Sequence, residues 1–410
     1  MGTPTPVRRI LLVDADAFYV AVARLADPEG AGRAPLLIVG GTAESRGVVC
    51  SASYETRKFG VRSAMPMRTA VRLCPDAMCV PVPMRACSVK SREIGAVLER
   101  WAPVVEQASI DEWYLDLGGT EALYHGESLA QIAARIREEV QRETTLTVSI
   151  GGGTNKLVAK LAVERAKPSR GADGVHIVQP GAEAEFLRTF RLAEIPLIGP
   201  KFQQRLDKLG MRTVDDVLQY DLSALARWLG PREADWLYER VRGIHDDPVE
   251  SGGDAKSISR DETFAQDIDS DAALADELLA LVVRAASDLR ADGMRARTIT
   301  VRVRDWDFRN RQASRTVEEP VVSDRAIHVV AREQLERLRA ARRVPVRRLT
   351  VALSSLAADP RANQLGLFAE TRGPALETDR DRTLAHTVDR VRARFGMDAI
   401  APAALRKERE

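Results

Sequence analysis

The stretch Arg9-Ile-Leu-Leu-Val-Asp-Ala-Asp16 decides how the rest of the chain is interpreted. Its apolar run has the length and the abrupt polar end of a strand that is buried in a sheet. Asp14 and Asp16 therefore lie at the C-terminal end of this predicted strand. A second acidic pair, Asp111 and Glu112, opens a later predicted strand. Carboxylates at neighbouring strand ends can hold divalent cations, because hard cations prefer oxygen ligands. Solvated turn residues are the alternative interpretation.

Outward from this strand, helices and strands are mixed in an order that favours an α+β domain, with antiparallel returns. The predicted strands and helices of the first 181 residues are strands 9–16, 35–40, 47–50, 110–117 and 147–150 and helices 63–73, 90–101, 128–143 and 155–166. A purely helical segment follows at 182–243, and then a Pro- and Gly-containing linker.

A second α+β unit is predicted after the linker. Strands at 298–304 and 348–353 alternate apolar and polar residues, as half-buried strands do, and helices at 272–292 and 324–341 would cover one face. The polar tail from Asp359 contains one apolar cluster and one further amphipathic helix near Thr383–Phe395.

Composition excludes several classes of protein. The 410 residues carry a formal net charge of +2 from 61 basic and 59 acidic side chains, which is ordinary for a globular protein and makes no case for a nucleic-acid partner. No apolar run reaches the ~18 residues of a transmembrane helix, and the N-terminus lacks a signal-peptide core. We therefore expect a cytoplasmic protein without a membrane partner. The four cysteines have the wrong spacing for a zinc site and are expected to be reduced thiols.

Basic and hydroxyl side chains recur in two stretches that suit a polyphosphate. Tyr54 and Arg57 are spaced to share one helical face in Ser53-Tyr-Glu-Thr-Arg-Lys-Phe-Gly-Val-Arg-Ser-Ala-Met65. Lys156 and Lys160 share a face near a predicted helix N-terminus, a favourable place for phosphate. A solvated basic surface is the alternative in both cases.

These motifs together resemble the Y-family translesion DNA polymerases of the DinB type. The residues that carry the resemblance are Asp-Ala-Asp-Ala-Phe-Tyr at 14–19, the stretch 53–65, Ser-Ile-Asp-Glu at 109–112 and Asn-Lys-Leu-Val-Ala-Lys at 155–160, in the family's order. The resemblance covers about residues 8–356 and implies a right-hand polymerase with an added little finger. The implied domains are palm at 1–17 and 83–181, fingers at 18–82, a helix-hairpin-helix thumb at 182–247, linker at 248–256, little finger at 257–357 and tail at 358–410.

The resemblance also implies a catalytic site. Asp14 and Asp111 would bind two Mg²⁺ ions, for which Mn²⁺ could substitute, Glu112 would help hold the catalytic ion, and the carbonyl of Ala15 would complete one metal shell. Such a metal pair clamps the attacking and leaving oxygens of phosphoryl transfer. The residues implied to contact the incoming deoxynucleoside triphosphate (dNTP) are Phe18, Tyr54, Arg57 and Lys167. Tyr19 would be the steric gate that excludes a 2′-hydroxyl.

Primer–template DNA is the implied macromolecular substrate. In the thumb, Ile195-Pro-Leu-Ile-Gly-Pro-Lys201 resembles a helix-hairpin-helix turn in which Leu197 replaces the usual first glycine. From Arg284 to Arg348 the chain has seventeen arginines and nine acids, an excess that suits the sequence-independent contacts of a polymerase with phosphates. The DNA-binding candidates are Lys156, Lys160, Gly199, Lys201, Arg297, Arg309, Arg311 and Arg315.

The apolar cluster in the tail, Gln364-Leu-Gly-Leu-Phe368, resembles the bacterial peptide that binds the sliding (beta) clamp. Leu365, Leu367 and Phe368 would fill an apolar groove, and Gln364 would be a polar anchor. The implied protein is a monomeric DNA-directed DNA polymerase for low-fidelity translesion synthesis. The alternatives are a catalytically inactive relative that acts as a clamp- and DNA-binding scaffold, which would be expected to lose the acids, and a nucleotidyl cyclase with a similar palm.

Overall fold

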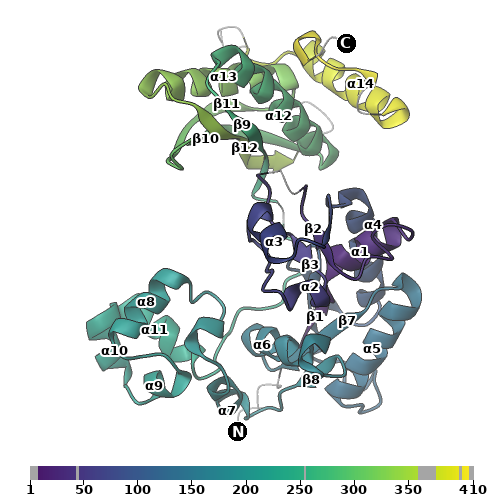
Figure 1. The fold of residues 1–410 in the computed structure, drawn as a ribbon, viewed down its shortest axis with the longest axis vertical. Coiled ribbons are helices and arrows are strands. Elements are labelled where there is room, and N and C mark those ends of the chain that lie inside the picture. The colour runs from purple at the N-terminus through teal and green to yellow at the C-terminus, as the bar shows by residue number, and fades with distance from the viewer. Residues whose placement is uncertain (1–7, 43–45, 254, 359–374, 397–398, 406–410) are drawn as a thin grey trace, which may run out of the picture. The chain divides into compact units, whose positions relative to one another are not determined.

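The computed structural model describes residues 8–42, 46–253, 255–358, 375–396 and 399–405, which form two compact units divided after Gly253. Both units combine helices with sheets (Figure 1), so the predicted α+β class is confirmed.

The first unit is built on a five-stranded sheet in the order β5-β6-β1-β7-β8. Residues of β1 alternate between its faces: Leu11 and Val13 pack with α1, α4 and α5, and Ile10 and Leu12 pack against α6. The bounds are β1 Ile10–Ala15, α1 Phe18–Ala26, α4 Met84–Leu98, β5 Val104–Gln107, β6 Glu112–Asp116, α5 Leu129–Thr144, β7 Val148–Gly153, α6 Lys156–Ala166, η1 Pro168–Arg170 and β8 Val175–Ile177.

Two smaller parts complete this unit. A three-stranded sheet in the order β3-β2-β4 carries two short helices, and a cluster of small helices packs its apolar residues against α6. The bounds are β2 Leu37–Val39, β3 Ser51–Ala52, α2 Tyr54–Arg57, α3 Met67–Leu73 and β4 Met78–Val80, and then α7 Glu183–Arg188, η2 Leu192–Glu194, α8 Pro200–Lys208, α9 Val214–Leu218, α10 Leu222–Leu229 and α11 Pro231–Arg240.

The second unit is an antiparallel sheet in the order β11-β10-β12-β9. Its apolar face packs against α12 and α13, and the other face is open. The bounds are β9 Ser257–Ile268, α12 Asp271–Ala291, β10 Met294–Asp305, β11 Asn310–Val321, α13 Asp324–Ala341, β12 Val346–Ala358, α14 Asp379–Phe395 and η4 Ala403–Leu405.

The prediction missed five strands and misplaced another. β4, β5, β8, β9 and β11 were not predicted. All five lie at sheet edges, and the long strands β9 and β11 carry many exposed polar residues, which hides the alternation that marks a strand. The strand expected at 47–50 is wrong, because pairing with β2 occurs at Ser51–Ala52 instead. Helix α4 begins six residues before the predicted start at Lys90.

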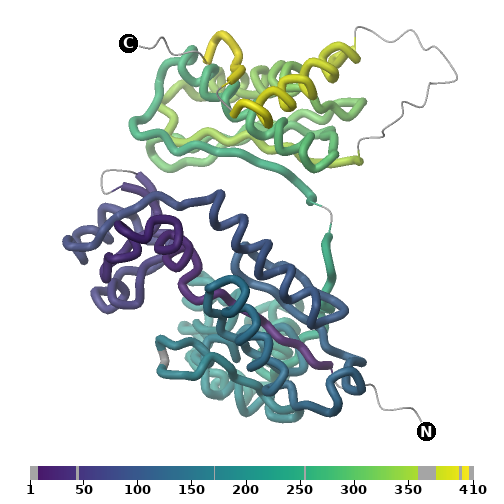
Figure 2. The backbone as a smooth tube through the Cα atoms, turned by 90° about the vertical axis from the view of Figure 1, so that its right-hand side faces the viewer, coloured from purple at the N-terminus to yellow at the C-terminus, as the bar shows by residue number. Residues whose placement is uncertain are grey.

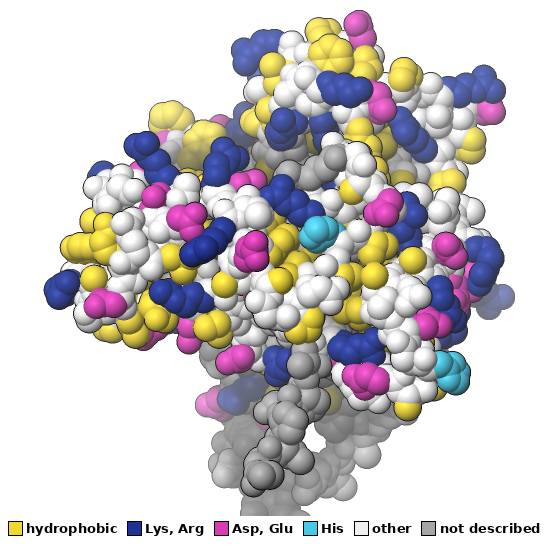
Figure 3. All heavy atoms as spheres, turned by 90° about the horizontal axis from the view of Figure 1, so that it is seen from below, with side chains coloured by type: hydrophobic (Ala, Val, Ile, Leu, Met, Phe, Trp, Pro, Cys, Tyr) yellow, Lys and Arg dark blue, Asp and Glu magenta, His cyan; other side chains and the backbone are white. Residues whose placement is uncertain are grey.

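The surface of this chain mixes charges of both signs. On the face seen in Figure 3, Lys and Arg side chains are interspersed with Asp and Glu. Among the described residues, no helix has the length and apolarity to span a membrane.

Helix α14 is joined to the second unit by buried charges and lies alongside its helices (Figure 2). The side chain of Arg290 on α12 is only 1% exposed and donates to Asp389 on α14, to Asp324 and to the carbonyl of Val322. Glu377, just before α14, accepts the backbone amides of Val322 and Ser323 at the start of α13. The amphipathic helix predicted near 383–395 is therefore part of this unit.

Replacing Asp389 by Ala should destabilise this unit by roughly 2–4 kcal/mol, because it removes a partner from a buried guanidinium. The matched control is Glu262→Ala, whose partner Arg284 is 45% exposed and whose loss should cost at most about 1 kcal/mol. Denaturant unfolding of the full chain measures both changes. Equal losses in the two variants would contradict the buried network.

Candidate active site

Two acids of the first unit face each other on neighbouring strands. Asp14 near the end of β1 lies directly opposite Glu112 at the start of β6, so both side chains leave the same face of the sheet. Asp14 is 7% exposed. Burial, reinforced by the charge of Glu112, raises the pKa of Asp14 to about 7, although Lys167 acts in the opposite direction. This pair is thus a partly desolvated acidic site, and a nearby cation stabilises its charged form.

Two lysines from the α6 side supply positive charge to this pair. Lys160 forms an ion pair with Glu112, and the amine of Lys167, just after α6, lies 3.1 Å from Asp14 and 2.6 Å from Glu164. Burial lowers the pKa of Lys167, and the adjacent acids Asp14 and Glu164 raise it. The effect of the acids is larger, so the pKa of Lys167 is raised. Sequence reasoning missed Glu164, although its spacing from Lys167 (i, i+3) was a signal.

Asp111, the third predicted metal ligand, forms a hydrogen bond within its own turn. The Asp111 carboxylate accepts a 2.6 Å hydrogen bond from the Ser109 hydroxyl, and the Asp111 carbonyl accepts the amide of Ala15. In the part of the chain that the structure describes, no group of three or more Asp, Glu, His or Cys side chains is gathered closely enough to hold a metal ion. The ligand set still fits a hard cation, because its donors are oxygens and the buried carboxylate of Asp14 already draws a lysine.

The residues predicted to hold a triphosphate lie beside these acids. Arg57 lies over the ring of Tyr54, with 5.1 Å between its guanidinium carbon and the ring centre. Burial raises the pKa of Tyr54, as do the charges of Asp16 and Asp14, whereas Arg57 and Lys167 lower it. Tyr54 therefore shares an environment with both the acids and the two cations.

The aromatic pair that opens α1 divides into two environments. Phe18 is 2% exposed and packs in the main core of this unit, which favours a structural role over the predicted nucleotide contact. Tyr19 is half-buried, and burial followed by the charge of Asp111 raises its pKa, which places its hydroxyl near that acid. The gate candidate thus lies by the acidic site.

Lys156 is engaged inside the protein. Its amine donates to the Glu106 carboxylate at 2.5 Å and lies 5.2 Å from the ring centre of Tyr114. Its side chain is only 14% exposed. The predicted DNA contact therefore has a competing partner at Lys156, as it has at Lys160. Sequence reasoning missed Glu106, because a partner fifty residues away leaves no local signal.

The predicted hairpin turn before α8 has Leu197 where a glycine was expected. Leu197 adopts φ 73°, a left-handed conformation that glycine reaches more easily, and the residue is 78% exposed. Gly199 precedes α8, and a Cβ there would meet no atom of the protein within 4 Å. Lys201 is exposed in the first turn of α8. The turn thus presents an open backbone to a ligand.

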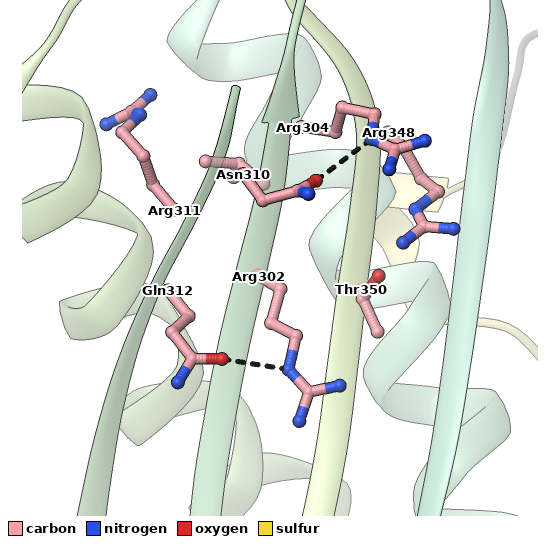
Figure 4. Close-up of a pocket in the computed structure, with 8 residues that line it drawn as sticks. Arg302, Arg304, Asn310, Arg311, Gln312, Arg348 and Thr350 are labelled. Carbon is pink, nitrogen blue, oxygen red and sulfur yellow. Dashed lines mark hydrogen bonds between the residues drawn. The ribbon is translucent and has the colours of Figure 1, made fainter. Parts of the chain in front are cut away.

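The open face of the second sheet carries its own basic group. Arg302 and Arg304 on β10 and Arg348 on β12 line a pocket of about 400 Å³ with Gln312 and Asn310 (Figure 4). The glutamine and asparagine oxygens accept hydrogen bonds from Arg302 and Arg304 respectively. Within the described residues, neither Arg302 nor Arg304 forms an ion pair with a carboxylate, whereas Arg348 lies 3.9 Å from Asp261.

Two arginines predicted to bind DNA lie on the opposite face of that sheet. The register pairs Arg311 with Val303 and Arg315 with Ile299, and both partners belong to the core under α12 and α13. Arg311 is paired with the fully buried Asp305, and Arg315 is paired with Glu333. These contacts favour structural roles over phosphate contacts. The sequence did not reveal this difference, because β11 was not predicted and its two faces could not be separated.

The remaining candidates differ in exposure. Arg309 is exposed in the turn between β10 and β11, and Arg297 donates to the carbonyl of Val317. The predicted clamp-binding residues Gln364, Leu365, Leu367 and Phe368 lie outside the described residues.

Comparisons with known proteins identify the family. Residues 13–164 match the impB/mucB/samB family, residues 255–367 match its C-terminal domain, and residues 193–245 match the thumb domain of DNA polymerase-iota. The chain is 36% identical over 396 residues to DNA polymerase IV of Desulfatibacillum aliphaticivorans, covering 97% of this chain and 96% of the relative. It is 36% identical over 320 residues to DNA polymerase IV of Gluconobacter oxydans, covering 78% of this chain and 87% of that one.

Solved structures agree. A Y-family DNA polymerase chimera of Dbh and Dpo4 matches with a TM-score of 0.74 and 26% identity, covering 85% of this chain and 99% of the chimera. DinB from Sulfolobus solfataricus matches with a TM-score of 0.57 and 27% identity, covering 84% and 98%. With Asp14 and Glu112 opposed on neighbouring strands and these relatives spanning nearly the whole sequence, the chain belongs to the impB/mucB/samB family, as a Y-family DNA polymerase of the DinB type.

Proposed function

We propose that this chain carries out template-directed DNA synthesis from dNTPs by two-metal nucleotidyl transfer, with low fidelity and past damaged template bases. The observation that carries the proposal is the opposed pair of Asp14 and Glu112, with Tyr54, Arg57 and Lys167 beside it, in a chain of the DinB type. A catalytically inactive scaffold has no observation in its favour, because the acids are present.

Divalent metal dependence follows from the family, and Mg²⁺, with Mn²⁺ as a substitute, is the proposed ion. Asp14, Asp111, Glu112 and the carbonyl of Ala15 would hold it. When bound, such ions activate the primer hydroxyl and neutralise charge on the leaving pyrophosphate. The lysines prepare the site: Lys160 balances Glu112, and Lys167 can exchange Asp14 and Glu164 for a phosphate oxygen.

Tyr54 and Arg57 are suited to bind the triphosphate. The Arg57 Nε donates to the carbonyl of Ala52 at 2.9 Å, which orients the guanidinium and leaves its outer nitrogens for a bidentate contact.

Glu112→Gln and Asp111→Ala should each lower primer extension at least about 100-fold, because a charge that stabilises the reacting centre is lost. Glu138→Gln, an exposed glutamate on α5, is the control and should leave the rate unchanged. Single-nucleotide extension with Mg²⁺ or Mn²⁺ measures the rate. Wild-type activity in either acid variant would disprove the proposed mechanism.

Tyr19 is proposed as the steric gate under the sugar of the incoming nucleotide. Tyr19→Ala should raise the insertion of ribonucleotides relative to deoxynucleotides by about tenfold or more, because the clash of the phenol ring with a 2′-hydroxyl disappears. Competing kcat/KM values for one ribonucleotide and its deoxy counterpart measure the ratio. An unchanged ratio would assign the gate elsewhere.

Primer–template DNA is the proposed substrate of both units. Gly199 and Lys201 are candidates for one phosphate contact, and the open face of the second sheet is proposed to grip the duplex through Arg302, Arg304 and Arg348, with Arg309 and Arg297 near it.

A sliding clamp is the proposed protein partner, through residues 364–368. A cytoplasmic monomer is the proposed state of the protein.

Replacing Arg302, Arg304 and Arg348 together by Ala should flatten the plot of log K for DNA against log salt by about 2–3 units, since each phosphate contact contributes about 0.9. Arg315→Ala, on the helix-covered face, is the control and should leave the slope as in the parent. A triple variant with the parental slope would remove the open face from the interface.

A further inference from the structure

The chain that follows the helical cluster is fastened to the palm at several points before it leaves the first unit. The carbonyl of Gly243 accepts a 2.8 Å bond from the buried side chain of Asn155, and the carbonyl of Asp246 accepts a 3.0 Å bond from Arg8. Val249 is 7% exposed and packs with Ile10 and its neighbours under α6. Residues 243–250 are therefore a bound strap on the palm.

A further contact of this segment, at Glu250, is made by Glu106, an acid that no proposed step of the reaction uses. Glu106 on β5 accepts the backbone amide of Glu250 at 2.8 Å and the amine of Lys156 at 2.5 Å through the same oxygen, Oε2. Both side chains of the ion pair are largely buried, with 14% exposure for Lys156 and 25% for Glu106. Charged hydrogen bonds in such surroundings are stronger than those in water.

Beyond Glu250 the character of the chain changes. Residues 251–253 are exposed, and the next strand, β9, begins at Ser257. The segment between the last anchored residue and the second unit is thus about seven residues long, and a segment of that length spans at most about 25 Å. If the contacts of Glu250 and Val249 were lost, the next anchored residue would be Asp246, and the same segment would be about eleven residues long.

We propose that Glu106 is a positioning residue, which shortens the tether between the two units by holding Lys156 and the amide of Glu250 on the palm. The local concentration of a tethered binding unit falls roughly as the −3/2 power of tether length. Lengthening the tether from about seven to about eleven residues should therefore weaken the joint grip of the two units on DNA about twofold. The inference rests on the proposed function in one respect, that the second unit grips DNA.

The test compares Glu106→Ala with Glu106→Gln, which keeps an acceptor oxygen, and with the control Glu138→Ala. Hydrogen exchange of peptides covering 244–253 should be faster in Glu106→Ala, intermediate in Glu106→Gln and unchanged in the control. The Kd for primer–template DNA should rise about twofold in Glu106→Ala, whereas single-turnover insertion at saturating DNA and dNTP should keep its rate.

A second variant separates tether length from any other effect of Glu106. Four Gly and Ser residues inserted between Ser251 and Gly252 of the otherwise unchanged chain should raise the Kd for DNA about twofold without faster exchange at Glu250. This result would support the length argument.

Three outcomes would overturn the inference. Unchanged exchange in Glu106→Ala would mean that Glu106 does not hold the strap. Faster exchange with unchanged Kd would mean that the strap does not position the second unit, and a slower insertion rate at saturation would assign Glu106 to the chemistry. An insertion variant with parental Kd, together with faster exchange in Glu106→Ala, would locate the failure in the proposed DNA grip instead.

Discussion

The antiparallel pairing of β1 with β6 is the constraint on which the site depends. Its register fixes Asp14 opposite Glu112, and a slip by one residue would turn one of the acids to the other face of the sheet. The register is secured by burial, because Leu11, Val13 and Leu115 are fully buried on the face under α4 and α5. The core therefore specifies the position of two charges that are not part of it.

Helix α6 is the second element on which the position and charge of the acidic site depend. Its apolar residues fill the opposite face of the sheet, and its lysines reach the acids at the strand ends. Close approach is possible because β7 has glycine where the helix passes: a Cβ on Gly151 would lie 2.0 Å from the amide nitrogen of Val163. One helix thus supplies packing, charge balance for Glu112 and, through Lys156 and its partner Glu106, part of the attachment of residues 243–250 to the first unit.

The sequence predicted much of this, and the failures have identifiable causes. Strand β1 and helices α5, α6, α12 and α13 were recognisable from local periodicity and capping residues, such as Ser128 and Asn155. The edge strands β9 and β11 were not, because their exposed polar faces resemble loops. Because β11 was not predicted, the sequence could not show on which face of the sheet Arg311 and Arg315 lie.

Within the candidate site, residue types were predictable from motifs, but partners were not. Lys160 looked like a free cation in a basic helix, whereas its actual partner, Glu112, is 48 residues away in sequence. The same holds for Lys156 and Glu106. Pairings of this kind depend on strand order, and strand order is a property of the fold rather than of any window of sequence.

The docking of α14 bears on where this protein can be divided. The match to the family's C-terminal domain ends at residue 367, yet Arg290 in the middle of that domain is neutralised by Asp389 beyond it. A fragment cut at the edge of the family match would retain a guanidinium that is 1% exposed and lack one of its two carboxylates. The family domain therefore ends before the structural unit in which Arg290 has both of its carboxylate partners. A fragment of this chain designed for protein engineering has to include α14.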